Sequence, residues 1–313
     1  MQGLSNSRVL TDDKIDYIIG GLDKKKYIRS LGFDPFPWQE AILESKCRRI
    51  IINAARQSGK STITSTDPCW IARFKDKSLS IVLAPTEAQS QDDMRKIQQF
   101  IRRDPYYPKY DPASTHVNVR ENESLISVVP ATQSARGKSQ PAVVILDEAS
   151  QIEDLIYTEV VTPMFTANDG RLILLSTPYG KKGFFFDIFN NPRPNDPWER
   201  YEVRSPWQPI QTPNGLDLIP YMDGNEKAYQ EERAKKGIRA WFSPRHYDYE
   251  EQLEKLFDMG IRKYQQEYCC EFVETESLVF SYDELARMFS GKKPEAKKQT
   301  IRRSGVDYSI LEE

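Results

Sequence analysis

Five apolar runs of five or six residues recur in the first two-thirds of the chain, separated by turn-forming residues. Their length and continuous hydrophobicity are typical of strands buried on both faces of a sheet. They cover residues 49–53, 79–84, 125–129, 143–147 and 172–176. Between them, residues 87–103 place Met94, Ile97 and Ile101 on one face of a helix. The alternation predicts an α/β fold whose mostly parallel central sheet is sandwiched by helices.

The pattern changes beyond residue 190. Prolines are concentrated between residues 192 and 213, and a charged, helical stretch follows at 226–236. We therefore expect a core with an N-terminal helical segment at residues 1–190 and a smaller subdomain with its connection at 191–290. The basic residues between 292 and 303 indicate a linker at the start of a third segment, 291–313.

Composition narrows the class of protein only modestly. A chain of 313 residues with 39% hydrophobic positions can bury a large core, and its formal charge of −2 requires any nucleic-acid contact to come from local patches. The four cysteines and two histidines show no metal-ligand spacing, which favours reduced thiols in a cytosolic protein. No apolar run is long enough for a membrane helix, so we expect a soluble protein.

The first chemical motif follows the first apolar run directly. Residues 54–62 read Ala-Ala-Arg-Gln-Ser-Gly-Lys-Ser-Thr, a P-loop with alanine at its first position. Such a loop wraps backbone N–H groups around phosphates; Lys60 would reach the β and γ phosphates of ATP, and Ser61 would help hold Mg²⁺. The other expected loop contacts are Arg56, Gln57, Ser58, Gly59 and Thr62. Pro68 is expected to kink or restart the helix that follows.

The second motif is a pair of carboxylates at the end of the fourth apolar run. Asp147 would hold Mg²⁺ through water, and the adjacent Glu148 would act as general base toward the attacking water. Small hydroxyl residues follow the fifth run, at Ser176 and Thr177, before Pro178. Because parallel strands end at one edge of the sheet, these three residues are expected to respond to the γ-phosphate and couple its loss to the next segment.

Taken in order, these motifs resemble those of the large subunit of viral DNA-packaging terminases. The resemblance rests on Pro37-Trp38-Gln39, residues 56–61, Asp147-Glu148 and Ser176-Thr177-Pro178, and it spans roughly residues 33–280. It implies a RecA-like P-loop NTPase of the additional-strand, catalytic-glutamate type, with a small lid subdomain.

The resemblance also implies roles for residues outside the central motifs. Gln39 would read the adenine, with Trp38 or Phe36 stacking beside it. Arg136, ahead of the acidic strand, would be an arginine finger that acts on a neighbouring subunit. Arg56, inside the P-loop, could supply the same charge within its own subunit, and both arginines remain candidates because a guanidinium suits γ-phosphate oxygens.

By the same resemblance, the motor would drive double-stranded DNA into a viral procapsid in the host cytoplasm. Its implied partners are a homo-oligomeric ring, a pentamer in the family, with a portal protein and a small terminase subunit; the isolated domain could be monomeric. Asp307 resembles the first metal ligand of an RNase H-like nuclease that begins near the end of the chain. One aspartate cannot assemble a two-metal site, so we expect no nuclease activity from this chain.

Two other interpretations remain open. A superfamily-two helicase also combines an upstream glutamine, a P-loop and an Asp-Glu pair, but it needs a second motor domain whose arginine motif does not follow residue 190. A nucleotide-gated assembly module needs ATP binding without turnover, which Glu148 argues against. Several basic residues could contact the DNA phosphates, and the sequence does not distinguish among them. They are Arg102, Arg103, Lys181, Lys182 and the basic tail.

Overall fold

The computed structural model describes residues 18–138, 140–166 and 169–274. A nine-stranded sheet forms the centre, in the order β11-β8-β1-β7-β6-β2-β5-β4-β3. Its strands are β1 (Arg49–Ala54), β2 (Leu79–Ala84), β3 (Tyr110–Pro112), β4 (His116–Val119), β5 (Ser124–Pro130), β6 (Val143–Asp147), β7 (Arg171–Ser176), β8 (Trp198–Arg204) and β11 (Ile238–Phe242). Pairing is parallel except where β4 joins β3 and β5. The five strands expected from the sequence are confirmed.

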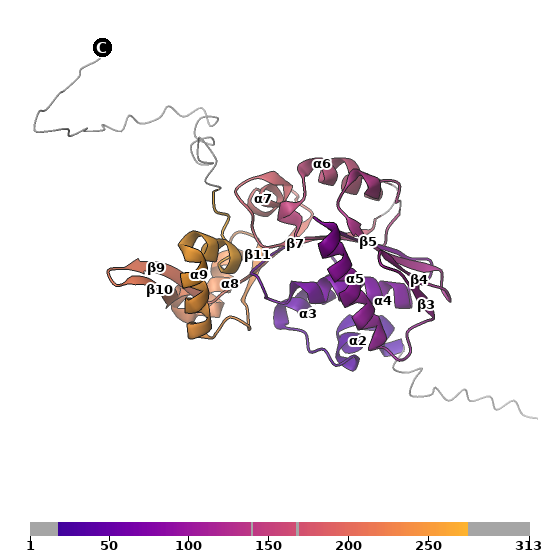
Figure 1. Ribbon diagram of the computed structural model, residues 1–313, viewed down its shortest axis with the longest axis horizontal. Coiled ribbons are helices and arrows are strands. Elements are labelled where there is room, and N and C mark those ends of the chain that lie inside the picture. The colour runs from indigo at the N-terminus through magenta and orange to yellow at the C-terminus, as the bar shows by residue number, and fades with distance from the viewer. Residues whose placement is uncertain (1–17, 139, 167–168, 275–313) are drawn as a thin grey trace, which may run out of the picture. The chain divides into compact units, whose positions relative to one another are not determined.

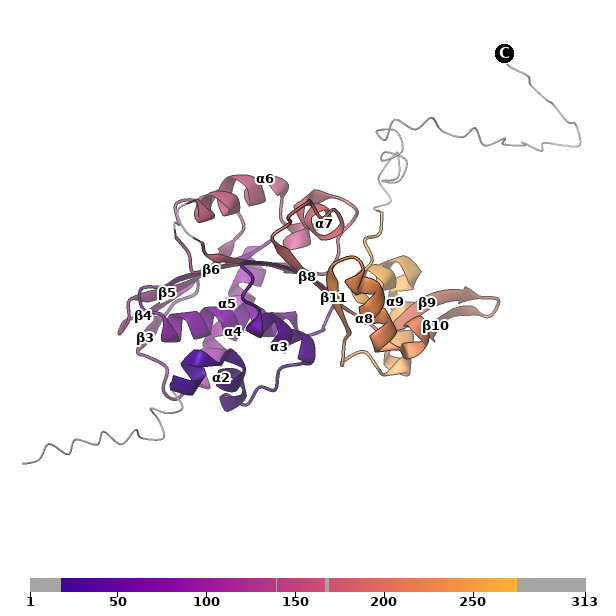
Figure 2. The same ribbon diagram turned by 180° about the vertical axis from the view of Figure 1, so that it is seen from behind.

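Helices cover both faces of this sheet (Figures 1 and 2). One face carries α2 (Lys24–Ser30), α3 (Pro37–Glu44), α4 (Lys60–Phe74) and α5 (Glu87–Arg102); the other carries α6 (Asp154–Ile156) and α7 (Gly183–Asn190). Alternate residues of β1 serve the two layers, because successive strand side chains point to opposite faces. Ile50 and Ile52 join the core beneath α2–α5, and Ile51 joins the core beneath α6 and α7.

The position of β7 decides the geometry of the site. It lies between β1, which leads into the P-loop, and β6, which ends in the acidic pair. In register, Asn53 of β1 faces Ser176 of β7, and Asp147 of β6 faces Leu175. An additional strand therefore separates the two nucleotide motifs, as expected, and three chain segments end at the same edge of the sheet.

The central sheet does not end at residue 190, where the sequence analysis places a domain boundary. The sheet continues through β8, which pairs with β1, and β11, which pairs with β8. Most of the prolines there flank strands, and Pro209 lies within β9 (Trp207–Thr212) of a separate two-stranded sheet. What has its own small core is the hairpin of β9 and β10 (Gly215–Pro220) with α9 (Tyr249–Tyr268). The charged helix expected at 226–236 is α8 (Glu226–Ala234).

Proline 68 neither ends nor restarts α4, which is helical from Lys60 to Phe74. Its neighbour Asp67 is 1% exposed and lies 2.7 Å from the ammonium of Lys24 and 3.7 Å from the guanidinium of Arg171. Burial of the helix against the sheet and these ion pairs hold the segment in spite of the N–H that proline lacks. A restart was therefore the wrong expectation.

The remaining short elements connect these layers. They are η1 (Gln133–Ala135), η2 (Ala149–Gln151), the π-helix η3 (Tyr157–Val161), η4 (Thr162–Phe165) and η5 (Tyr221–Gly224). Within the described ranges, no helix is both long enough and apolar enough to cross a membrane. The linker and the nuclease start expected at 291–313, including Asp307, lie outside the described residues.

Candidate active site

The loop between β1 and α4 has an unusual backbone. Gln57 and Gly59 both take left-handed conformations, with φ of 60° and 102°, and Gly59 caps the N-terminus of α4. A Cβ on Gly59 would meet Nε2 of Gln39 at 3.0 Å, so both its dihedral angle and its surroundings require glycine. Such a turn at the start of a helix is typical of loops that bind anions through backbone N–H groups.

Lys60, the first residue of α4, connects this loop to the acidic strand. Its side chain is 10% exposed, its Nζ donates to the carbonyl of Ala54 at 3.2 Å, and it lies 3.8 Å from Oε1 of Glu148. Ser61 and Thr62 follow in the first turn of the helix, and each is half-buried. The lysine expected to meet phosphates is thus held between the P-loop and the expected general base.

Gln39 contacts the P-loop directly. It is 3% exposed, its Nε2 donates to the carbonyl of Gly59 at 2.9 Å, and its Oε1 accepts from the N–H of Phe36 at 2.8 Å. Trp38 is different: it is 1% exposed and belongs to the hydrophobic core. A ring enclosed in this way argues against the expected stacking of Trp38 on a base, and half-buried Phe36 is the other stacking candidate.

Glu148 turns back toward the P-loop because its backbone is left-handed, with φ of 46°. This conformation costs a non-glycine residue free energy and is common at functional sites. Its Oε2 accepts from the hydroxyl groups of Ser176 at 3.1 Å and Thr177 at 3.4 Å. Ser150 bridges Oγ of Ser176 and the carbonyl of Thr177, both at 2.7 Å. The expected coupling residues are therefore hydrogen-bonded to the expected base, and Pro178 is buried behind them.

The acidic strand delivers Asp147 beside a carboxylate that the sequence analysis did not consider, Asp93 of α5. Desolvation, then the charges of Asp93 and Glu148, raise the pKa of Asp147 well above its ordinary value. Asp93 is 2% exposed, and desolvation also raises its pKa. Its Oδ2 is buried without a hydrogen-bond partner among the residues described.

These groups suit a magnesium ion. Mg²⁺ prefers one or two carboxylates and keeps several waters or phosphate oxygens. Asp147 and the Ser61 hydroxyl offer oxygen ligands of that kind, and one buried oxygen of Asp93 has no hydrogen-bond partner among the described residues. Across the described parts of the chain, no group of three or more His, Cys, Asp and Glu side chains could hold a metal by itself. Phosphate oxygens and water would have to complete the coordination.

The two candidate arginines lie in different surroundings. The side chain of Arg56 is 62% exposed, its backbone N–H donates to the carbonyl of Glu267 in α9 at 2.7 Å, and its guanidinium is 3.9 Å from the carboxylate of that residue. Arg136 follows η1 on an exposed loop, is 53% exposed and pairs with Glu159 of η3. Arg56 is thus hydrogen-bonded to α9, whereas Arg136 lies on the surface.

This chain is similar to known proteins in both sequence and fold. The sequence matches the family described as "Terminase large subunit, T4likevirus-type, N-terminal" over residues 51–287, more than half of the chain. The chain belongs to this family. It is 27% identical to the terminase large subunits of Thermus virus P23-45 and Thermus phage G20c, with 51% of this chain and 37% of each relative covered. This terminase chain therefore spans less than half the length of those relatives.

A solved structure shares the fold. The large terminase ATPase domain of Thermus phage P74-26 superposes with a TM-score of 0.57 at 21% identity, covering 79% of this chain and 98% of that one. At this level of identity the likeness concerns the fold alone. It supports the mixed α/β architecture of this terminase chain and the mostly parallel sheet.

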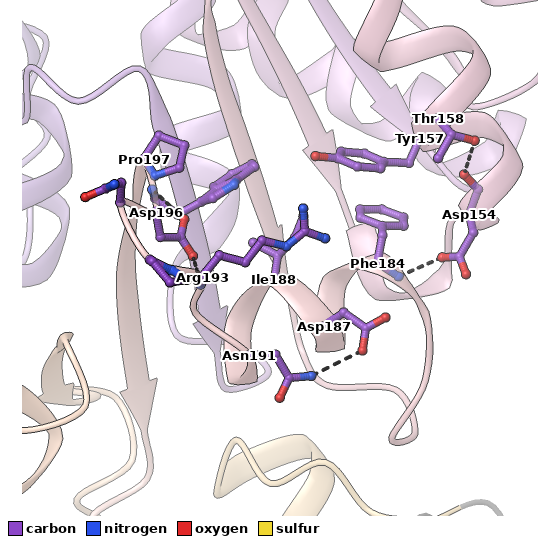
Figure 3. A pocket seen from close by; sticks show the side chains of 13 residues that line it. Asp154, Tyr157, Thr158, Phe184, Asp187, Ile188, Asn191, Arg193, Asp196 and Pro197 are labelled. Carbon is purple, nitrogen blue, oxygen red and sulfur yellow. Dashed lines mark hydrogen bonds between the residues drawn. The ribbon is translucent and has the colours of Figure 1, made fainter. Parts of the chain in front are cut away.

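This terminase chain also contains a cavity of about 780 Å³ away from the P-loop (Figure 3). Trp198 at its wall pairs with Arg49, where β1 begins, so the cavity lies at the opposite edge of the sheet. Tyr157 stacks on Phe184 with ring centroids 4.3 Å apart, and Asp154 accepts from the N–H of Phe184 at 2.6 Å. The cavity is thus separate from the expected ATP site, although its π-helix also carries Glu159.

Sequence reasoning missed three residues near the P-loop of this terminase: Asp93, Glu267 and His246. Asp93 has helical spacing that places it with the buried positions of α5, a signal that was available. His246 is 1% exposed and packs edge-on against Tyr268 with ring centroids 5.3 Å apart. Burial, then the charge of Lys255, lowers the pKa of His246 to about 4. Nothing local in the sequence signals that Glu267 or His246 is close to the P-loop.

Proposed function

We propose that this chain is an ATP-hydrolysing motor of a terminase large subunit and couples ATP hydrolysis to translocation of double-stranded DNA into a viral procapsid. One observation carries the proposal. The P-loop lysine, the acidic pair and the hydroxyl motif meet at one sheet edge, with Glu148 3.8 Å from Lys60 and 3.1 Å from Ser176. Family membership supplies the packaging context.

In this proposal, the nucleotide is held by the backbone of residues 54–62 and by Lys60. Gln39 fixes the loop through its hydrogen bond to the carbonyl of Gly59, and we retain it as the residue that would read the adenine. Magnesium, when bound by Asp147 and Ser61, would neutralise phosphate charge. Asp147 is the last residue of β6, and Ser61 is the second residue of α4.

Glu148 acts as the general base toward water. Its left-handed backbone turns the carboxylate away from the axis of β6, and two hydroxyl donors on β7 and its following turn orient it. A positioned base contributes about 10²–10⁴-fold to the rate. Arg136 is the proposed finger for a neighbouring subunit because it is exposed on the segment between β5 and β6, while Arg56 is the alternative within the same subunit.

Coupling would start from the hydrogen bonds that join Glu148, Ser176 and Ser150, because loss of the γ-phosphate changes the contacts of Glu148. A second connection runs to the proposed lid, formed by β9, β10 and α9. The amide of Asn53 donates to the carbonyl of Cys270 at 2.9 Å, and the N–H of Arg56 donates to Glu267. Movement of the P-loop would therefore reach the segment that leaves this domain.

The proposed partners follow from the family. They are double-stranded DNA, further copies in a homo-oligomeric ring, a portal protein and a small terminase subunit, with the complex docked on a procapsid in the host cytoplasm. The family match favours this assignment over a superfamily-two helicase. A nucleotide-gated module without turnover is the second candidate, and the hydrogen-bonded position of Glu148 is the observation that argues against it.

Phosphate release by the wild type and by Glu148→Gln tests the proposal. Glutamine keeps the size and the hydrogen-bond acceptor but cannot take a proton, so turnover should fall about 10²–10⁴-fold while ATP affinity stays within a few-fold. Glu153→Gln, five positions away and exposed, is the matched control. Unchanged turnover in Glu148→Gln would show that the base is assigned wrongly. Binding by the wild type without any turnover, in an assembled ring, would favour the gated module.

A further inference from the structure

A second buried carboxylate faces the acidic strand from the helical layer. Asp93 of α5 has only 3% of its side chain exposed, and it interacts directly with the carboxyl group of Asp147. A buried carboxylate is costly unless it is paired or binds a cation. Asp93 is therefore a group for which the fold must provide a counter-charge.

Lys96, one turn later on α5, provides only part of that charge. Its Nζ is 3.3 Å from Oδ1 of Asp93, but its closer partner is the half-exposed Asp92, at 2.7 Å. The other oxygen of Asp93, Oδ2, has no donor within the described part of the chain. An ion pair with Lys96 alone would leave this oxygen without a partner among the described residues, beside the carboxyl group of Asp147.

The same groups converge on the hydroxyl that the P-loop offers to a metal ion. Lys96 Nζ donates to Oγ of Ser61 at 3.3 Å, so Ser61, Asp93 and Asp147 surround one region between α4, α5 and β6. All three present hard oxygen atoms, which Mg²⁺ prefers. A divalent cation there would give the unpartnered oxygen of Asp93 a partner.

We propose that Asp93 is a second carboxylate of the magnesium site, supplying an oxygen to the coordination shell of the ion alongside Asp147. The inference rests on the proposed function, because it assumes that Mg²⁺ with ATP occupies this edge of the sheet. Asp93 would thus give the ion a carboxylate ligand that lies outside the P-loop and the acidic pair.

The test compares Asp93→Asn with Asp92→Asn. Both remove one negative charge from adjacent positions of α5 and one partner of Lys96, but only Asp93 faces Asp147. The measurement is the affinity for a fluorescent N-methylanthraniloyl derivative of ATP, with excess Mg²⁺ and with EDTA. The ratio of the two dissociation constants reports the metal contribution without any turnover.

We expect the wild type and Asp92→Asn to bind the nucleotide more tightly with Mg²⁺. Asp93→Asn should lose about 10–100-fold of that gain, while its affinity in EDTA stays equal or improves.

Other results would overturn the inference. A full Mg²⁺ effect in Asp93→Asn, or an equal loss in Asp92→Asn, would reduce Asp93 to a structural residue or to a general charge effect. A lower melting temperature together with weaker binding in EDTA would likewise assign it to folding. A wild type whose binding ignores Mg²⁺ would overturn the proposed function as well, which separates the two failures.

Discussion

The ion pair between Arg136 and Glu159 should restrain the proposed finger only weakly. Both side chains are about half exposed, at 53% and 45%. Exposed pairs contribute about 0.2–1 kcal/mol, because solvent screens the attraction and ordering two long side chains costs entropy. Removing the carboxylate with Glu159→Gln therefore frees Arg136 at a small free-energy change. Turnover in an assembled ring should rise by at most about fivefold.

Removing the arginine itself should have a much larger effect. A finger contributes about 10³–10⁵-fold to the rate, so Arg136→Ala should abolish most of the activity of an assembly while ATP still binds. The assay is initial phosphate release at saturating ATP, at protein concentrations where specific activity no longer rises. Arg120→Ala is the control, since Arg120 is exposed and pairs with a surface aspartate, Asp111.

The reasoning would be refuted by two outcomes. If Glu159→Gln lowers turnover more than tenfold, the pair holds Arg136 in a productive position instead of restraining it. If Arg136→Ala retains activity, the finger assignment fails and Arg56 becomes the better candidate.

Three further predictions concern the site and its surroundings. Gln39→Ala, which removes the hydrogen bond to Gly59, should weaken ATP binding by about two- to tenfold in a fluorescence titration; unchanged affinity would contradict its role. Ser176→Ala should lower kcat by about two- to tenfold at unchanged ATP affinity, because Glu148 loses one donor; a change confined to affinity would argue against orientation of the base. Neutral His246 has a pKa lowered from 6.5 to about 4, so the unfolded chain takes up a proton first as pH falls. The contribution of His246 to the free energy of unfolding should therefore drop by about 3 kcal/mol between pH 6.5 and 4, so His246→Gln should lose less stability over this range than the wild type, while the exposed His116→Gln should match the wild type; equal slopes for wild type and His246→Gln in chemical denaturation would refute this.

Much of the fold was predictable because its central strands are continuous apolar runs. β8 was missed for a physical reason: its sequence carries Glu202 and Arg204, which are both 4% exposed. Glu202 is compensated by Arg233 and Tyr229, about thirty residues later in the chain. Charged residues of this kind indicate a surface until their partners are known, so the sheet was predicted to end too early.

The site was predictable to the extent that its chemistry lies in short motifs. The positions of Lys60, Glu148 and Ser176 at one edge follow from the order of parallel strands. The side-chain direction of Trp38 does not follow from its neighbours in the sequence, and its ring packs in the hydrophobic core beneath the helices. Asp93 was overlooked because a charged stretch of α5 indicates a solvated face unless helical spacing is counted residue by residue.

The measurement that tests the account most directly is phosphate release by a mixture of Glu148→Gln and Arg136→Ala. Each variant alone should be nearly inactive, the first without a base and the second without a finger. In a ring, an Arg136→Ala subunit keeps its base and can receive Arg136 from a Glu148→Gln neighbour, so the mixture should recover activity that rises with protein concentration. Two inactive variants that stay inactive when mixed, at concentrations where the wild type is active, would contradict a terminase motor with a finger supplied between subunits.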